Sequence, residues 1–225
     1  MNKEEKEQYL IQRLEDMLSY EHNLWEAGIP CVGGVDEVGR GPLAGPVCAA
    51  CVVLPQDFDV IGVNDSKKLS EKKRRELYAV IVGRALAYGI GLVDNKRIDE
   101  VNILNATKEA MTAAVSAAAA MLSARALTED EKTIGHLLVD AVKLPEAGIP
   151  GTAIVQGDEK SVSIAAASIV AKVTRDRIMV GFDDIYPGYG FSSNKGYGTE
   201  AHYAGLQAKG PTPIHRKTFL HEEKQ

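Results

Sequence analysis

Acidic side chains follow three apolar segments of the chain, at places where the preceding residues must be buried. Asp36 and Glu37 come after "CVGGV", Asp140 ends "LLVD", and Asp158 ends "AIVQGD". A carboxylate beside buried apolar residues is unfavourable unless a cation or strong hydrogen-bond donors compensate it. Because the ends of neighbouring strands in an α/β sheet converge on one crevice, acids placed in this way indicate a shared metal site.

The types of ligand indicate which metal such a site would hold. Carboxylates without a cysteine or histidine shell suit Mg²⁺ or Mn²⁺, and two such ions about 3.5–4 Å apart activate water and stabilise the leaving oxygen in phosphodiester cleavage. Asp36 and Glu37 are adjacent, so on a regular strand their side chains face opposite ways. Asp36 is therefore expected to bridge the metals, whereas Glu37 needs a bulge or contributes from the side.

Each of these acids also has an ordinary structural explanation. An aspartate after a strand commonly forms a turn or caps a helix, and Asp158 precedes a helical pattern. The sequence alone does not show that the strands are neighbours. A non-catalytic module that uses the same acids to hold a structural ion, or that only binds nucleic acid, therefore stays open as an alternative.

The cysteines are compatible with a reducing compartment. Three cysteines cannot make the disulfide framework of a small secreted domain. Cys48 and Cys51 form a C-x-x-C motif, but a spacing of three on the expected strand puts them on opposite faces, so buried small residues are favoured over a zinc or redox site. No apolar run is long enough to cross a bilayer and residues 1–30 lack a signal-peptide core, so we expect a cytoplasmic protein with no membrane partner.

The charge distribution bears on the binding partner. The net charge is −5, and residues 1–30 hold seven acids and three bases, which leaves the rest of the chain close to neutral. Residues 65–75, "DSKKLSEKKRR", hold six bases and two acids. Alone, such a basic ridge is typical of a solvated helix face. With metal ions masking the acids, however, it can bind a polyanion.

Apolar periodicity predicts the elements that position the acids. We expect one amphipathic helix within residues 1–29, ended by Gly28 and Pro30, and then a hairpin made of "CVGGVDEVG" and "GPVCAACVVL". A helix over about 70–86, with Ser70 as its N-cap, and a strand at "AYGIGLVDN" should follow. The alanine-rich stretch over about 101–124 predicts another helix, because alanine has the highest helix propensity.

The second half of the chain repeats this alternation. "HLLVDAV" and "GTAIVQGD" predict two short strands, and residues 161–186 predict a helix that stops at Pro187, with a short helix around 199–208. Strands alternating with helices after a hairpin predict an α/β fold with a mixed sheet flanked by helices. The expected parts are an N-terminal helical appendage (1–29), a catalytic core (30–187) and a mainly helical, substrate-binding C-terminal segment (188–225).

Several blocks of the sequence, taken in order over roughly residues 30–220, resemble the bacterial ribonuclease HII family. They are "GVDEVGRGPLAGPV", "NDSKKLS", "LLVDA", "GDEKS" followed by "AASIVAKVTRD", "KGYGT" and "GPTPIHRKTF". Several blocks in one order are far more specific than a single motif. The resemblance implies an RNase H-like fold that hydrolyses the RNA strand of RNA/DNA hybrids. It also implies nicking on the 5′ side of single ribonucleotides embedded in duplex DNA, leaving 3′-hydroxyl and 5′-phosphate ends.

The resemblance also assigns roles to individual residues. It makes the four acids a metal-binding quartet, and it implies that backbone groups of Gly39, Arg40 and Gly41 contact the ribonucleotide's 2′-hydroxyl. Only residues without a Cβ let a main chain approach a sugar so closely. Tyr197 would stack on the sugar of the next deoxynucleotide. Without the resemblance, "GRGPLAG" is an ordinary tight turn and Tyr197 a surface aromatic.

The resemblance also implies contacts between individual residues and the nucleic-acid backbone. Ser66, Lys67 and Lys172 are candidate phosphate contacts, while each can equally be exposed or capping. His215 and Arg216 are either structural or in contact with the duplex, and Asp176 is assigned no metal. The expected partners are RNA/DNA hybrids and ribonucleotide-containing duplex DNA, bound by a monomer, with a replication-clamp contact as an open possibility. The alternative enzyme is a related RNase H-like nuclease that needs longer hybrid stretches.

Overall fold

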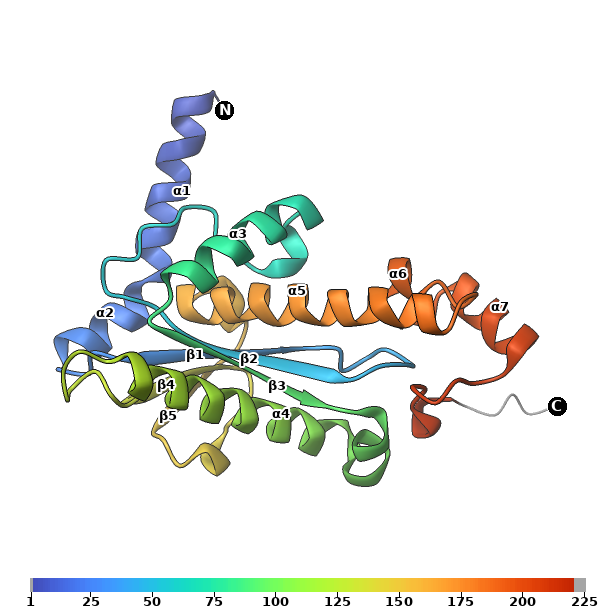
Figure 1. Ribbon diagram of the computed structural model, residues 1–225. Helices are drawn as coiled ribbons and strands as arrows, with labels where there is room; N and C mark the ends of the chain where they lie inside the picture. Colours follow the sequence, from blue (N-terminus) through green and yellow to red (C-terminus); the bar gives the residue numbers. More distant parts are fainter. Residues whose placement is uncertain (1, 221–225) are drawn as a thin grey trace.

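The computed structural model describes residues 2–220 and builds them around a five-stranded sheet in the order β3-β2-β1-β4-β5 (Figure 1). The strands are β1 Val32–Val38, β2 Val47–Val53, β3 Ala87–Val93, β4 His136–Asp140 and β5 Gly151–Ile154. β1 and β2 form the predicted hairpin, and β2 pairs antiparallel with β3, whereas β1 pairs parallel with β4 and β4 with β5. The predicted α/β fold with a mixed sheet is confirmed.

Both faces of the sheet are covered by helices (Figure 1). One face carries α4, Asn95–Arg125, and the other carries α5, Val162–Ile185, with α3, Glu71–Arg84, beside it. Every residue of β2 is buried, as expected for a strand covered on both sides. At Gly34 a Cβ would lie 2.1 Å from the carbonyl carbon of Ser163, so only glycine lets the first turn of α5 lie against β1.

The two cysteines of the C-x-x-C motif lie on opposite faces of β2, as predicted. Cys48 packs in the core beneath α5, and Cys51 packs in the core beneath α4. Burial raises the pKa of each thiol to about 12, so both stay protonated at neutral pH. Because the two cysteines lie on opposite faces of the strand, they cannot bind one metal together or form a disulfide with each other.

The single N-terminal helix expected within residues 1–29 is wrong, because the segment forms two helices. They are α1, Lys3–Met17, and α2, Ser19–Glu26, which meet at Leu18. Leu14, Met17 and Leu18 are buried in the core beneath α5. The junction also allows Glu21 to turn into the protein, where it is fully buried. Apolar periodicity did not reveal the junction because α2 continues the helical pattern of α1.

The alanine-rich helix begins earlier than expected, and its first part is set off by a kink. Asp94 caps α4 by accepting the N–H of Arg97 at 2.8 Å, so the helix begins at Asn95, six residues before the predicted start. At Asn102 the backbone is left-handed, with φ of 68°, and the Asn102 side chain accepts the N–H groups of Leu104 and Asn105. The helix therefore restarts at Asn102, which explains why the alanine pattern marks only its second part.

The other predicted helices are present with small changes in their bounds. Ser70 caps α3, α5 ends just before Tyr186, and α7 spans Glu200–Lys209, while a further short helix, α6, covers Phe191–Asn194. The predicted C-terminal segment runs to residue 225, of which 221–225 lie outside the described residues. Within residues 2–220, no helix combines the length and apolar character needed to span a bilayer.

Candidate active site

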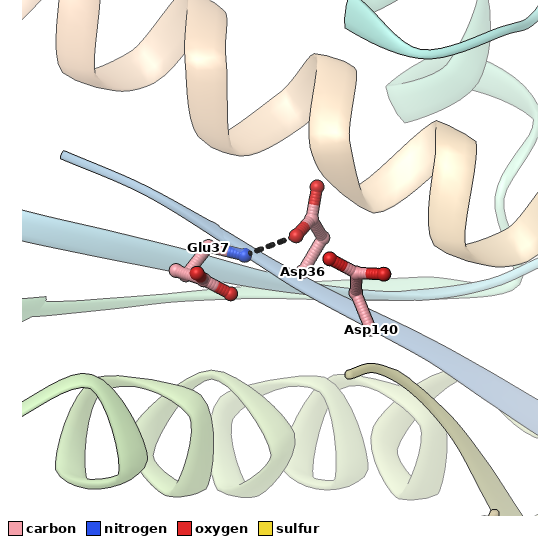
Figure 2. Close-up of side chains that lie close together, drawn as sticks. All are labelled: Asp36, Glu37 and Asp140. Carbon is pink, nitrogen blue, oxygen red and sulfur yellow. Dashed lines mark hydrogen bonds between the residues drawn. The ribbon is translucent and has the colours of Figure 1, made fainter. Parts of the chain in front are cut away.

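Three of the four candidate metal ligands meet where β1 and β4 end side by side. Asp36 and Glu37 are near the end of β1, and Asp140 is the last residue of β4, with Val35 and Val139 paired just before them. Each acid offers a carboxylate oxygen within 4.8 Å of the other two (Figure 2). We call Asp36, Glu37 and Asp140 the acidic cluster.

Glu37 reaches this cluster without a bulge in the strand. The antiparallel register continues through Asp36, Glu37 and Val38, so the side chains of Asp36 and Glu37 leave the strand in opposite directions. Asp36 points toward α5, and the Glu37 carboxylate lies to the side of it (Figure 2). Of the two arrangements considered for Glu37, the structure has the sideways one, because the longer side chain reaches around the end of the sheet.

Asp158 lies outside the acidic cluster and beyond the end of its strand. β5 stops at Ile154, and Asp158 belongs to a 3₁₀ turn, Gly157–Glu159, that leads into α5. The N–H of Gly157 donates to Asp140 Oδ1 at 2.7 Å, which ties this turn to the cluster. The predicted strand end at Asp158 is therefore wrong, but the turn still carries Asp158 to the neighbourhood of Asp140.

The acids strongly disfavour one another's charge. Burial, followed by the charges of Glu37 and Asp140, raises the pKa of Asp36 well above its ordinary value. Burial also raises the pKa of Glu37, although Arg40 opposes the shift, and burial with Asp65 and Asp140 raises the pKa of Asp158 to about 6. A nearby positive charge would favour the ionised forms of these carboxylates.

The residues fit a divalent cation. The ligands are all carboxylate oxygens, which Mg²⁺ and Mn²⁺ prefer. Within residues 2–220, Glu37 Oε2 is buried and has no hydrogen-bond partner, so one oxygen of the acidic cluster is free to take a ligand. An unsatisfied buried carboxylate oxygen is costly, and a bound cation would compensate that cost.

The "DSKK" loop lies against the acids and contains a further acid that sequence reasoning missed. Asp65 is buried and raises the pKa of Asp158. Burial alone would lower the pKa of Lys67, but the charges of Asp65, Asp158 and other acids outweigh it, and the pKa is raised. Lys67 thus lies near these acids, whereas Ser66 is buried and accepts a hydrogen bond from Ser168 of α5 at 2.9 Å.

The remaining candidates lie around the acidic cluster with different partners. Lys172 forms an ion pair with Asp176 at 2.8 Å, one helical turn along α5. Arg40 is exposed and pairs with Glu37 at 3.5 Å. A Cβ on Gly41 would lie 3.6 Å from the ring of Tyr197, so the Gly-Arg-Gly turn and Tyr197 share one surface although they are far apart in the sequence. Tyr197 keeps 43% of its surface exposed, which leaves its ring accessible.

Two buried arginines lie beneath this turn; sequence reasoning missed Arg175, and it left Arg216 as either structural or in contact with the duplex. Arg175 and Arg216 are both completely buried and donate to main-chain carbonyls of residues 39–46. Helical spacing does not distinguish a buried arginine from an exposed one, because arginine is usually at the surface. A signal was nevertheless present, since "KVTRD" places Arg175 on the same helix face as buried apolar residues such as Met179.

Comparisons with known proteins agree with this geometry. A family model described as Ribonuclease HII matches residues 33–222. The chain is 51% identical over 210 residues to the ribonuclease HII of Caldanaerobacter subterraneus subsp. tengcongensis, covering 93% of this chain and 82% of that protein.

Solved structures share the fold over most of the chain. The ribonuclease H2 from Pyrococcus horikoshii matches with a TM-score of 0.63 and 28% identity, covering 84% of this chain and 93% of that one. The RNase HII in a PCNA complex from Archaeoglobus fulgidus matches with a TM-score of 0.65 and 25% identity, covering 87% and 98%. The chain therefore belongs to the ribonuclease HII family and is a type II ribonuclease H, a nuclease of a kind that acts on RNA/DNA substrates.

Proposed function

We propose that this ribonuclease is a metal-dependent endonuclease that nicks duplex DNA on the 5′ side of a single embedded ribonucleotide and also hydrolyses the RNA strand of RNA/DNA hybrids. The products would carry 3′-hydroxyl and 5′-phosphate ends. The observation that carries the proposal is the acidic cluster, in which three buried or half-buried carboxylates converge at the ends of adjacent strands. Such an arrangement of carboxylate oxygens suits a pair of divalent ions.

The proposed ligands are Asp36, Glu37, Asp140 and Asp158. When bound, divalent ions would supply activation of the attacking water and stabilisation of the leaving oxygen. Asp36 accepts the N–H of Glu37 at 2.7 Å, and Asp140 is held by the N–H of Gly157. Glu37 has one oxygen on Arg40 and one without a partner within residues 2–220. These contacts fix the carboxylates in place before substrate arrives, which lowers the reorganisation needed in the reaction.

Ribonucleotide recognition is proposed for the turn at Gly39, Arg40 and Gly41, together with Tyr197. The N–H groups of Arg40 and Gly41 have no hydrogen-bond partner within residues 2–220, and both residues are exposed. Free main-chain donors on a glycine-flanked turn can reach a 2′-hydroxyl oxygen, the group that distinguishes RNA from DNA. The neighbouring Tyr197 ring offers a flat apolar surface on which a sugar can pack. Lys67 and, beyond it, Lys172 are proposed to contact phosphates.

The experiment is cleavage of three duplexes of one sequence: all-DNA, DNA with one ribonucleotide, and a long RNA/DNA hybrid. We expect Mg²⁺- or Mn²⁺-dependent nicking of the second and third, loss of both with a chelator, and no cut in the first. End-labelling should place the nick 5′ of the ribonucleotide. Cleavage of the hybrid alone would favour a nuclease that needs longer hybrid stretches, and binding without cleavage would favour a non-catalytic module.

A replication-clamp contact is proposed as well. Its support is the structural neighbour from Archaeoglobus fulgidus, which was solved in a complex with PCNA. Gel filtration of this chain with the sliding clamp of its own replication machinery tests it. Co-elution that survives nuclease treatment would support the contact, and separate elution at micromolar concentrations would contradict it.

A further inference from the structure

The turn that carries Gly39, Arg40 and Gly41 continues to Pro46, and its carbonyl groups point into the protein. We call residues 39–46 the sensing loop. Arg216, in the C-terminal segment, donates from Nη2 to Gly39 O at 2.5 Å and to Gly45 O at 2.9 Å. It also donates from Nη1 to Arg40 O at 2.8 Å and from Nε to Gly45 O at 3.0 Å. One guanidinium therefore joins both ends of the sensing loop.

A second guanidinium holds the far end of the same loop. Arg175 of α5 donates from Nε to Pro46 O at 2.9 Å and from Nη2 to Ala44 O at 3.2 Å. Its Nη1 donates to Lys195 O at 2.9 Å, two residues before Tyr197. At Gly39, where φ is 95°, a Cβ would lie 2.2 Å from Arg175 Nε, so a side chain there would displace the arginine. The sensing loop and the Tyr197 segment are thus fixed to one another through Arg175.

These two cations are buried without an acidic partner. Among the described residues, neither Arg175 nor Arg216 forms an ion pair with a carboxylate, and both are completely buried. Burial, together with the charge of Arg175, lowers the pKa of Arg216 to about 9, so it remains protonated at neutral pH. Burying an unpaired cation is expensive, and carbonyl dipoles recover only part of that cost. Apolar side chains in their place would leave the loop carbonyls without donors, so the two guanidinium groups fix the main chain of the loop.

Arg216 is itself held from the opposite side of the molecule. The side chain of Asn95, at the start of α4, donates to His215 O at 2.8 Å. Asp99 accepts the N–H groups of Lys217 and Thr218 at 2.9 and 3.0 Å. The first part of α4, before the kink at Asn102, therefore clamps the residues on both sides of Arg216. The guanidinium has little freedom to move away from the sensing loop.

We propose that Arg216, assisted by Arg175, is a positioning residue for ribonucleotide recognition. By binding the loop carbonyls it turns the N–H groups of Arg40 and Gly41 outward, toward the 2′-hydroxyl. This inference rests on the proposed function, because it explains how the proposed recognition turn acquires its geometry.

The test compares Arg216→Ala and Arg216→Lys with the wild type on duplex DNA containing one ribonucleotide. Most binding energy comes from backbone phosphates, so KM should change by less than about threefold. A displaced sensing loop should lower kcat by about 100-fold in Arg216→Ala, since a misplacement of about 1 Å has that effect on a rate. In Arg216→Lys the charge is kept, but a single ammonium group cannot reach all three carbonyls. The kcat of this variant should therefore fall by about tenfold. Arg84→Ala, which removes an exposed pair with Asp59, is the matched control and should keep wild-type kcat.

Two further readouts separate positioning from loss of folding. The Mn²⁺ affinity of the variants without substrate should stay within about threefold of wild type, because the acidic cluster does not contact Arg216. Millimolar methylguanidinium should raise the kcat of Arg216→Ala by at least about tenfold, because it can fill the space left by the arginine side chain. If Arg216→Ala does not show a cooperative thermal transition, the kcat and Mn²⁺ affinity of Arg216→Lys are compared with those of the wild type instead.

The possible outcomes decide between the two proposals. Wild-type kcat in a folded Arg216→Ala or Arg216→Lys variant would overturn the positioning role. A parallel loss of kcat and Mn²⁺ affinity without rescue would also overturn it, because it would indicate general damage to the fold. Failure of the wild type itself to nick at a single ribonucleotide would instead count against the proposed function.

Discussion

Burial and neighbouring carboxylates disfavour the ionised forms of Asp36 and Glu37, and this destabilises the protein wherever no cation compensates it. Asp36 is buried, and its pKa is raised well above the ordinary value by burial and by its two neighbours. A group whose ionised form is disfavoured in the folded state lowers stability at neutral pH. The acidic cluster (Figure 2) therefore lowers the stability of the metal-free protein, a cost that the proposed metal-binding role accounts for.

Asp36→Asn should accordingly stabilise the metal-free protein while removing its response to metal. We expect the free energy of unfolding without metal to rise by about 1–2 kcal/mol, measured by urea denaturation with a chelator present. Saturating Mn²⁺ should raise the melting temperature of the wild type but not of this variant. Asp130→Asn, at an exposed acid outside the cluster, should keep the wild-type response. A less stable Asp36→Asn protein would show that the acids are not in conflict.

Tyr197→Ala tests the stacking role at the same scale. The ring lies beside Gly41 and is partly exposed, so its removal should disturb the substrate and leave the carboxylates unchanged. We expect kcat/KM on a single embedded ribonucleotide to fall by about 10- to 100-fold, in line with 1–3 kcal/mol for a stacking contact. Tyr197→Phe should retain most activity. Equal losses of activity and Mn²⁺ affinity in Tyr197→Ala would contradict the assignment.

Among the elements, the N-terminal helices are fastened to the helix that follows Asp158. Glu21 of α2 accepts a hydrogen bond from the hydroxyl of Ser161 at 2.6 Å and from the N–H of Ser163 at 3.0 Å. Ser161 in turn caps α5. Burial raises the pKa of Glu21, and the hydrogen bonds from Ser161 and Ser163 partly offset that shift. The N-terminal helices thus help to hold the start of α5.

Glu21→Ala should therefore destabilise the whole protein. Removing the carboxyl leaves two buried donors without partners, and each such donor costs about 1–3 kcal/mol, so we expect the free energy of unfolding in urea to fall by about 2–3 kcal/mol. Glu15→Ala, at an exposed position of α1, should change stability by less than about 0.5 kcal/mol. Similar values for the two variants would mean that the N-terminal helices are not anchored through Glu21.

Much of this arrangement of elements follows from the sequence, and the exceptions have identifiable causes. The hairpin, α3, α5 and α7 were predictable from periodicity and from caps such as Ser70. The start of α4 was missed because Asn102 interrupts the pattern with a left-handed residue. Asp158 was placed at a strand end because "AIVQGD" does not reveal that the strand stops at Ile154. Local patterns identify elements, whereas junctions and turns depend on contacts made elsewhere in the chain.

At the scale of the whole molecule, two buried histidines make stability depend on pH. The N–H and hydroxyl of Thr212 lie 2.8 Å from His215 Nδ1, His215 and His202 meet through their Nε2 atoms at 2.9 Å, and His202 Nδ1 lies 2.9 Å from Tyr197 O. Because the carbonyl only accepts, His202 must donate from Nδ1, and His215 must donate from Nε2 to His202. Only neutral rings satisfy this chain, and protonation of either would break it.

This chain should weaken the protein in mild acid. Burial, followed by the neighbouring His202, lowers the pKa of His215 from 6.5 to about 4. The unfolded state then binds more protons, so the contribution is complete above 6.5 and is lost as the pH falls from 6.5 toward 4. At about pH 5 this amounts to about 2 kcal/mol of lost stability.

The measurement is urea denaturation of the wild type and His215→Gln at about pH 7.5 and pH 5. The raised pKa of Asp36 acts in the opposite direction, since protonation there relieves repulsion, so the difference between the two proteins isolates the histidine. The wild type should lose about 2 kcal/mol more than the variant between these pH values. An equal loss in both proteins would show that His215 does not titrate as described.

The whole chain also explains why a nuclease with a net charge of −5 can bind a polyanion. Most of the excess acid lies in residues 1–30, at the N-terminal helices, and a further group lies in the acidic cluster, where cations would mask it. The proposed binding surface is instead built from the "DSKK" loop, the sensing loop and Tyr197. Composition could not reveal this separation, because it depends on where the sheet and the helices place each charge.

The most direct test of the account is the nicking of a duplex with one embedded ribonucleotide by Asp140→Asn. Asp140 lies between the β1 acids and the turn that carries Asp158, and asparagine preserves its size and its bond with Gly157. We predict that Mg²⁺-dependent nicking is abolished while duplex binding stays within about tenfold of wild type. An unimpaired nicking rate in Asp140→Asn would contradict the account.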